Sequence, residues 1–359
     1  MTVGTRRPGA AGWLAEAYES LRAHAGLSVL VLAYVLIALA VGAAFGDARR
    51  ISVSLYTYHF NVVTVIFGEI FLIAHAIYIV FVVRPERPIK AFVTSLRSKY
   101  LTQRRLFNAV PIIVLLSIFS SVCTSLKAMI PLMHQYDWDA ALTAWDTALH
   151  FGIPPWRLLQ PVLGYPVLTG VVSVMYGSWM VVLAACLFWQ AFSERDPRLR
   201  MQFFMTYVLC FALLGNLAAT WLASGGPCYY GRLVAGPNPY APLMRYLNQA
   251  NQQVPLGWSI GVQDMLWNNY TRGSLEFGSG ISAMPSMHVA GATLCALLGW
   301  RANRRLGMAL IVYTGIIMIG SVHLGWHYAI DGYVSVLATL AIWGAVGAGL
   351  DRFGVVRAG

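Results

Sequence analysis

Long apolar runs separated by short polar segments recur along this chain of 359 residues. Each run approaches the roughly 20 residues that an α-helix needs to cross a bilayer. The pattern therefore predicts an all-α fold, a polytopic membrane helical bundle in which the sixth span is the shortest. The eight predicted spans are residues 27–45, 62–83, 106–130, 162–192, 201–223, 286–300, 306–322 and 326–350.

The composition supports the same fold class. Hydrophobic residues make up 58% of the chain and charged residues only 11%, whereas a soluble domain is about a quarter charged. This excludes a soluble enzyme and a disordered chain. The five cysteines have no spacing typical of a metal site or a disulfide scaffold.

The net charge is +11, and most of the 25 Lys and Arg lie in alternate connecting segments. In a membrane protein, such segments face the cytoplasm beside anionic lipid. We therefore expect both termini to be cytoplasmic, in a plasma membrane or bacterial inner membrane, with membrane lipids and no nucleic acid as neighbours of these charges.

The runs divide the chain into five expected parts. These are a cytoplasmic or interfacial segment at 1–26, five spans within 27–223 with an outer interfacial helix near 134–150, an outer loop cap at 224–285, catalytic spans at 286–350 and a cytoplasmic tail at 351–359. Loops as long as the expected cap are usually functional or disordered, and its aromatic content favours an ordered one.

Polar residues that could perform chemistry gather in three short stretches, at 225–232, 284–288 and 321–331. The predicted topology places each stretch at the outer end of a span. We therefore expect them to converge at one depth on the outer face of the membrane.

The stretch Pro285-Ser286-Met287-His288 is typical of a helix start, where Ser286 caps free backbone N–H groups. A helix N-terminus favours an anion, and His288 would lie beside any phosphate held there. The alternative is a simple cap with an interfacial histidine.

His327 and Asp331 are four residues apart and would share a face of a helix. The carboxylate could orient the imidazole and leave its second nitrogen as a nucleophile or base. An acid inside a span costs about 2.5–3.5 kcal/mol, which favours a functional role over a pair that merely joins helices.

Other polar residues have less distinctive patterns. Arg232 follows a Gly-Gly-Pro turn and could bind a phosphate, or simply face lipid headgroups. His323, four residues before His327, could donate to a phosphate or complete a metal face with His327, Asp331 and His288. Gly325 lies between the two histidines and disfavours that metal face, so we expect no metal.

Pro-Ser-x-His at Pro285–His288, followed by His-x-x-x-Asp at His327–Asp331, resembles the type 2 phosphatidic acid phosphatase superfamily. The Gly-Pro-x-Tyr-Tyr stretch ending at Tyr230 and the Ser-Met-His sequence resemble its inositol phosphorylceramide synthase branch. The likeness covers about residues 224–333.

The resemblance implies a phosphohistidine mechanism that needs neither metal nor cofactor. In it His327 attacks phosphorus, Asp331 orients His327, and His288 protonates the leaving oxygen. Ser286 would hold phosphoryl oxygens, and Tyr230 would lie at the same phosphate. The implied substrates are a lipid phosphoester and an alcohol or water acceptor.

The sequence departs from the superfamily in its phosphate-binding residues. The Lys-x6-Arg-Pro motif is absent, and Ser321 stands where the last motif has an arginine. The expected substitutes are Arg232 first, then Arg245, Arg272 and His323.

We therefore expect an outer-leaflet lipid phosphotransferase. One alternative is a phosphatase of lipid or isoprenyl phosphates. Another is a lipid-binding or transport protein, suggested by Glu69 and His75 within the second span, although no inverted repeat supports it. The sequence does not define an oligomeric state.

Overall fold

The computed structural model describes residues 10–46, 48–254 and 257–353, and all regular structure in these residues is helical. The α-helices are α1 (Ala10–Phe45), α2 (Thr57–Ile77), α3 (Pro88–Ser95), α4 (Gln103–Ala128), α5 (Ile130–Met133), α6 (Asp139–Leu149), α7 (Pro155–Leu163), α8 (Pro166–Gly177), α9 (Trp179–Ala191), α10 (Pro197–Ala212), α11 (Ala219–Trp221), α12 (Tyr230–Leu233), α13 (Ala241–Gln253), α14 (Gly257–Arg272), α15 (Met287–Ala302), α16 (Arg304–His323) and α17 (Ala329–Phe353). Short 3₁₀ or π-helical segments are η1 (Ala48–Arg50), η2 (Tyr78–Val83), η3 (Leu96–Tyr100), η4 (Leu213–Ala218) and η5 (Pro227–Tyr229).

Seven helical stretches in the described residues are long and apolar enough to cross a membrane, which confirms the predicted polytopic helical bundle. They are Trp13–Phe45, Thr57–Val83, Gln103–Ala128, Pro166–Ala191, Pro197–Trp221, Arg304–His323 and Ala329–Arg352. The predicted sixth span corresponds to α15, which has only 16 residues and is shorter than these seven.

Helix α15 forms the centre of the bundle, with α9, α10, α16 and α17 packed around it. Its closest neighbour is α16, and glycines allow this approach. A Cβ atom on Gly307 would lie 2.5 Å from the Trp300 backbone, and Gly299 lies opposite Gly307. Small residues at such crossings let membrane helices come into backbone contact. Because α15 is surrounded by protein, its first turn is held rigidly.

The first 36 described residues form one helix rather than an interfacial helix followed by a separate span. No proline interrupts the sequence there, and a glycine such as Gly26 weakens a helix without ending it. Residues 1–9 of the expected interfacial segment lie outside the described part of the chain.

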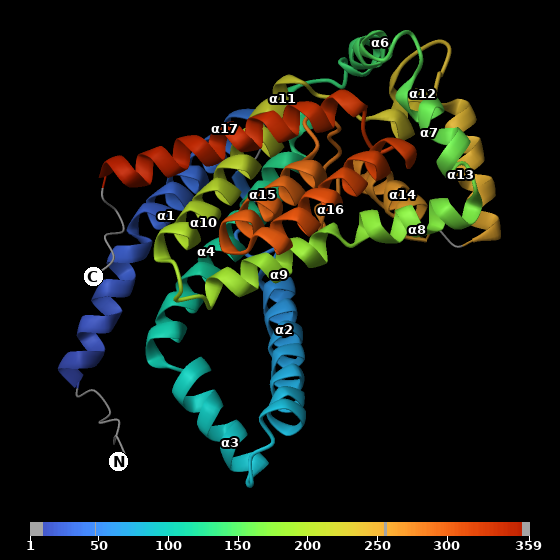
Figure 1. The fold of residues 1–359 in the computed structure, drawn as a ribbon. Helices are drawn as coiled ribbons and strands as arrows, with labels where there is room; N and C mark the ends of the chain where they lie inside the picture. The colour runs from blue at the N-terminus through green and yellow to red at the C-terminus, as the bar shows by residue number, and fades with distance from the viewer. Residues whose placement is uncertain (1–9, 47, 255–256, 354–359) are drawn as a thin grey trace.

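A layer of shorter helices covers one end of the bundle. Figure 1 shows α6, α12 and α13 at this end, far from the start of α1 and the end of α17. Helix α6 lies within the segment 134–150, where an outer interfacial helix was expected, and η5, α12, α13 and α14 lie within the segment 224–285. Helices α2 and α3 extend away from the bundle (Figure 1).

The connection between α16 and α17 is short and sharply turned. Helix α16 ends at His323, and Gly325 follows with a φ of 72°, a left-handed conformation that glycine adopts without strain. Helix α17 begins only at Ala329. The predicted break between His323 and His327 is therefore confirmed, and it places His327 in the connection itself.

Candidate active site

Three side chains meet where α15 and α17 begin. His288 lies in the first turn of α15, Asp331 in the first turn of α17, and His327 just before α17. The Nε2 atom of His327 lies 3.3 Å from Nδ1 of His288, and its Nδ1 atom lies 3.3 Å from Oδ2 of Asp331. The three residues expected to be catalytic are thus adjacent. A turn, rather than one helical face, brings His327 and Asp331 together.

The contacts of His327 define where its proton lies. Its Nδ1 atom is 2.8 Å from the carbonyl oxygen of Ala283. A carbonyl only accepts hydrogen bonds, so Nδ1 must be the donor, and Nε2 of the neutral imidazole keeps its lone pair. Nδ1 of His288, which faces that lone pair, is then the donor in the contact between the histidines. The arrangement combines a free nucleophilic nitrogen with an adjacent proton donor.

Aromatic rings hold His288 in place. The Tyr176 ring stacks on the imidazole at a centroid distance of 4.6 Å and an interplanar angle of 20°. The Trp179 ring lies at 4.6 Å and is tilted by 56°. Tyr176 is on α8 and Trp179 is on α9, and the two rings restrict the orientation of the imidazole.

Asp331 is buried, and its environment suits a carboxylate that orients a histidine. Its Oδ2 atom accepts a hydrogen bond from the Tyr328 amide at 3.0 Å as well as facing His327. The Ser335 hydroxyl donates to the Asp331 carbonyl at 2.7 Å and fixes the first turn of α17. The carboxylate is therefore held against His327 by backbone geometry.

Asp139, at the start of α6, fixes the other side of the His327 connection. Its carboxylate accepts hydrogen bonds from the amides of Gly225 and Gly226, both at 2.8 Å, and from the Tyr328 hydroxyl at 2.7 Å. Burial raises the pKa of the Asp139 carboxyl, while these three donors act in the opposite direction. The Gly-Gly-Pro turn is thus tied to the residue next to His327.

Gly226 is required at this turn for two reasons. Its φ is 92°, and a Cβ atom would lie 2.6 Å from the carbonyl oxygen of Trp326. The Cys228 amide adds a bond of 2.9 Å to the Gly325 carbonyl. The stretch that begins at Gly225 therefore supports the connection that carries His327 through its backbone.

Asp146, at the other end of α6, caps α17. Its two carboxylate oxygens accept from the amides of Ala329 and Ile330 at 3.1 and 3.0 Å. Burial raises the pKa of the Asp146 carboxyl, and the two amides oppose that shift. An acid at a helix N-terminus stabilises the helix and satisfies its free N–H groups. Helix α6 thus positions the turn that carries Asp331.

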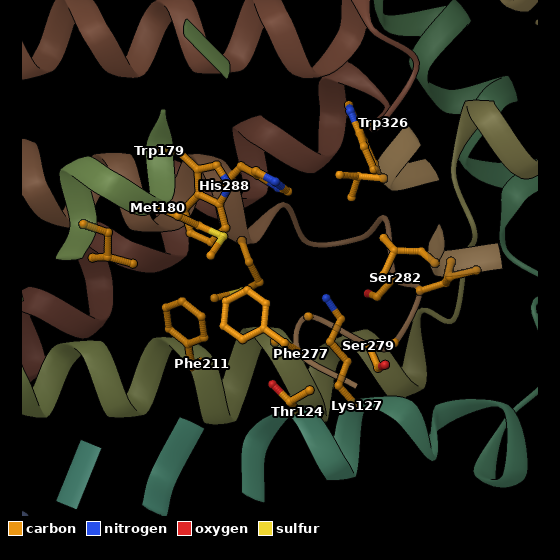
Figure 2. Close-up of a pocket in the computed structure, with 18 of the residues that line it drawn as sticks. Thr124, Lys127, Trp179, Met180, Phe211, Phe277, Ser279, Ser282, His288 and Trp326 are labelled. Atoms are coloured by element: carbon orange, nitrogen blue, oxygen red, sulfur yellow. The ribbon is translucent and has the colours of Figure 1, made fainter. Parts of the chain in front are cut away.

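The two histidines form part of the wall of a cavity of about 510 Å³. At the end near His288 and His327 the cavity contains Lys127, Ser279 and Ser282, which Figure 2 shows beside one another. Its other walls are mainly apolar and come from α2, α9 and α10, including Phe60, Leu183, Leu187 and Phe211. One cavity thus combines a polar end with an apolar interior.

The three arginines expected to bind phosphate lie outside the cavity lining. Arg232 is exposed and lies 3.7 Å from Asp264, with its guanidinium over the Trp267 ring. Arg245 and Arg272 are also exposed. None of the three lines the cavity, because the cap helices that carry them direct these side chains outward.

The other residues expected to bind phosphate, Ser286, His323 and Tyr230, have contacts within the protein. Ser286 caps α15 by accepting from the Val289 amide, as the sequence predicted, and it is buried outside the cavity lining. His323 faces the Thr169 hydroxyl at 2.9 Å, and the Tyr230 ring packs on Tyr240.

The four-residue metal face is therefore not assembled. His323 points to α8 while His327 turns towards His288, because Gly325 separates them. In the part of the chain that the structure describes, no group of three or more His, Cys, Asp or Glu is arranged to hold a metal ion.

Lys127 was not identified as a candidate from the sequence. It is in the last turn of α4, far along the chain from the three polar stretches. The only sequence signal was an ammonium group at the end of an otherwise apolar run, which also fits a residue at the membrane boundary.

The bundle and this site define a class of integral membrane proteins in which a partly exposed histidine, a buried histidine and a buried carboxylate meet at the starts of two helices. The sequence profile of the PAP2 superfamily matches residues 140–345, more than half of the chain, and the chain belongs to this superfamily. Its members are phosphatases and phosphotransferases, so lipid phosphatase or phosphotransferase chemistry is the activity that the family indicates. The comparisons with curated proteins and with solved structures gave no match.

Proposed function

We propose that this protein is a lipid phosphotransferase that works through a phosphohistidine at His327, in the manner of an inositol phosphorylceramide synthase. The observation that carries the proposal is the contact of 3.3 Å between Nε2 of His327 and Nδ1 of His288. This contact supports a mechanism in which a lone pair on one imidazole attacks phosphorus and an N–H of the other protonates the oxygen that leaves.

The proposed first step forms a bond between phosphorus and Nε2 of His327 and breaks the bond from phosphorus to the leaving oxygen. The proton on His288 passes to that oxygen. His327 keeps its Nδ1 proton and gains positive charge, which the Asp331 carboxylate at 3.3 Å stabilises.

The proposed second step returns the histidines to their starting state. The acceptor, an alcohol or water, attacks phosphorus while His288 takes its proton, and the bond to His327 breaks. The phosphoryl group moves to the acceptor oxygen, so no oxidant or reductant is needed.

The shape and lining of the cavity support a lipid as the donor. Its polar end contains the histidines, and its apolar walls lie between membrane-spanning helices, beside Phe60, Leu183 and Phe211. A phosphate on a hydrocarbon chain fits both parts, because burying apolar chain in such walls is favourable at about 25 cal/mol per Å². A small water-soluble phosphoester would leave the apolar walls unused.

Phosphohistidine trapping tests the proposal. Purified protein is incubated with a lipid labelled at its phosphate and quenched in alkali, which preserves phosphohistidine. We expect label on His327 in the unaltered protein and none in His327→Ala. Label retained in His327→Ala would refute the nucleophile, and absence of label from the unaltered protein across a panel of donors would refute the mechanism.

A donor and acceptor panel read by lipid mass spectrometry separates the possible activities. Transfer of the phosphoryl headgroup to an added alcohol supports the transferase. Release of inorganic phosphate alone would replace it with the phosphatase alternative, and donor binding without any product would favour a lipid-binding or transport protein.

A further inference from the structure

Phosphoryl transfer spreads negative charge over the oxygens around phosphorus, and positive groups must be positioned to balance it. Before the reaction, His327 is the neutral nucleophile and His288 is its neutral partner, so neither imidazole carries a positive charge. The arginines expected to provide it point away from the cavity. A cation from another part of the chain would supply this charge.

Lys127 is the only Lys or Arg among the described residues that line the cavity, and no Asp or Glu lines it. In Figure 2 the side chain extends from α4, and its nitrogen points into the cavity beside Phe277 and Ser282. The described residues offer this ammonium no hydrogen bond or ion pair. The cavity wall therefore contains one basic side chain and no acidic one.

The backbone around Lys127 is closely packed. Gly280 has a φ of 99°, and a Cβ atom there would lie 2.8 Å from Cγ of Lys127 and 3.0 Å from its carbonyl carbon. The segment that contains Gly280 is held by a bond of 3.0 Å from the Tyr136 hydroxyl to the Ile281 carbonyl. The lysine stem is thus enclosed while its end reaches the cavity.

An ammonium group inside a protein cavity is unfavourable unless an opposite charge or water lies beside it. An anionic ligand would remove this cost. The two histidines beside the cavity suit phosphoryl chemistry, and its apolar walls suit a hydrocarbon chain. A lipid phosphate is therefore the anion that fits this cavity.

We propose that the Lys127 ammonium binds the phosphate of the substrate and supplies the positive charge that Arg232 was expected to supply. This inference rests on the proposed function for its chemistry, but it makes a separate statement about anion binding. Ser282, whose hydroxyl lies beside Lys127 in the cavity, is positioned to donate to the same anion.

Binding of orthovanadate and inorganic phosphate to the purified full-length protein tests the inference without turnover. Thermal unfolding is followed with increasing anion, with sodium chloride at equal ionic strength as the reference. We expect both anions to raise the melting temperature of the unaltered protein, and Lys127→Met to weaken the apparent affinity at least tenfold. Lys127→Arg, which keeps the charge, should retain much of it.

Lys90→Met is the matched control, because Lys90 is an exposed lysine on α3 and should leave anion binding unchanged. Lys127→Gln provides a second neutral variant if Lys127→Met does not fold. Anion binding that is equal in the neutral Lys127 variants and the unaltered protein would overturn the inference. So would a loss of binding in Arg232→Met alone, or no binding by the unaltered protein.

The two proposals fail differently. Phosphohistidine on His327 together with normal anion binding by Lys127→Met would overturn only the role of Lys127. Anion binding that depends on Lys127, together with no phosphohistidine on the protein after incubation with any donor, would overturn the enzymatic proposal. Lys127 would then remain as part of an anion-binding site.

Discussion

His288 has one hydrogen-bond partner in the described residues, His327, and its ring is held by the rings of Tyr176 and Trp179. The N–H of His288 therefore has only Nε2 of His327 as an acceptor until a substrate oxygen binds. A residue in such surroundings is suited to protonate a leaving group, and the importance of that proton depends on how basic the leaving oxygen is.

His288→Ala should lower kcat by about 10²–10⁴-fold for a donor with an alkyl leaving group. The loss should be much smaller for a nitrophenyl phosphoester, whose leaving oxygen departs without a proton. Steady-state rates on the two donors test this, with His327→Ala inactive on both. Equal losses on the two donors would contradict the role of general acid.

The sequence allowed prediction of the residues that lie near one another through local spacing. Pro285–His288 and His327–Asp331 each fold into a turn or helix start, so two short sequence motifs were enough to predict which side chains lie together. Lys127 depends on the packing of α4 against the segment around Gly280, which no local pattern encodes. Arg232 follows a suggestive turn, but that turn binds Asp139 and directs the arginine outward.

At the scale of elements, α6 supports the active site without contributing to its chemistry. Asp139 binds the Gly225–Gly226 turn and Tyr328, and Asp146 caps α17. The two carboxylates therefore hold the His327 connection from both sides. Its position depends on an amphipathic helix that lies outside the spanning bundle.

Asp146→Asn should lower the free energy of unfolding by about 1–3 kcal/mol, because one of the two amides at the start of α17 loses its acceptor. It should also reduce kcat, since Asp331 is in the same turn. Thermal unfolding in detergent and donor turnover measure the two effects. Asp137→Asn is the control, because Asp137 is exposed and should change neither. An unaltered melting temperature in Asp146→Asn would contradict this role of α6.

Hydropathy predicted the spanning elements well, because a bilayer requires long apolar helices whatever their packing. It did not distinguish α15, which is short and surrounded by protein, from a helix that contacts lipid. It also separated the first helix into two parts, since a change from mixed to apolar residues resembles a boundary even where the backbone continues.

At the scale of the whole molecule, the start of α17 and the cap helices lie at one end, and α1 begins and α17 ends at the other (Figure 1). The charge distribution favours cytoplasmic termini. We therefore expect the active site to face away from the cytoplasm, where it would meet outer-leaflet lipid.

Cysteine labelling tests this orientation. A membrane-impermeant maleimide added to intact cells should modify Gln252→Cys, on the exposed side of α13, and should spare Glu86→Cys, in the connection before α3. Permeabilised cells should allow both to react, and the unaltered chain provides the background of its own cysteines. The opposite pattern in intact cells would reverse the proposed topology.

The family profile begins at residue 140, so Asp139 and Lys127 both precede it. A fragment that began at residue 140 would keep both histidines and Asp331. It would lack the Lys127 side chain and Asp139, which is one of the two carboxylates that support the His327 turn. Any transplant of this catalytic unit into another membrane scaffold must therefore bring along the last turn of α4, or find a replacement for its charge.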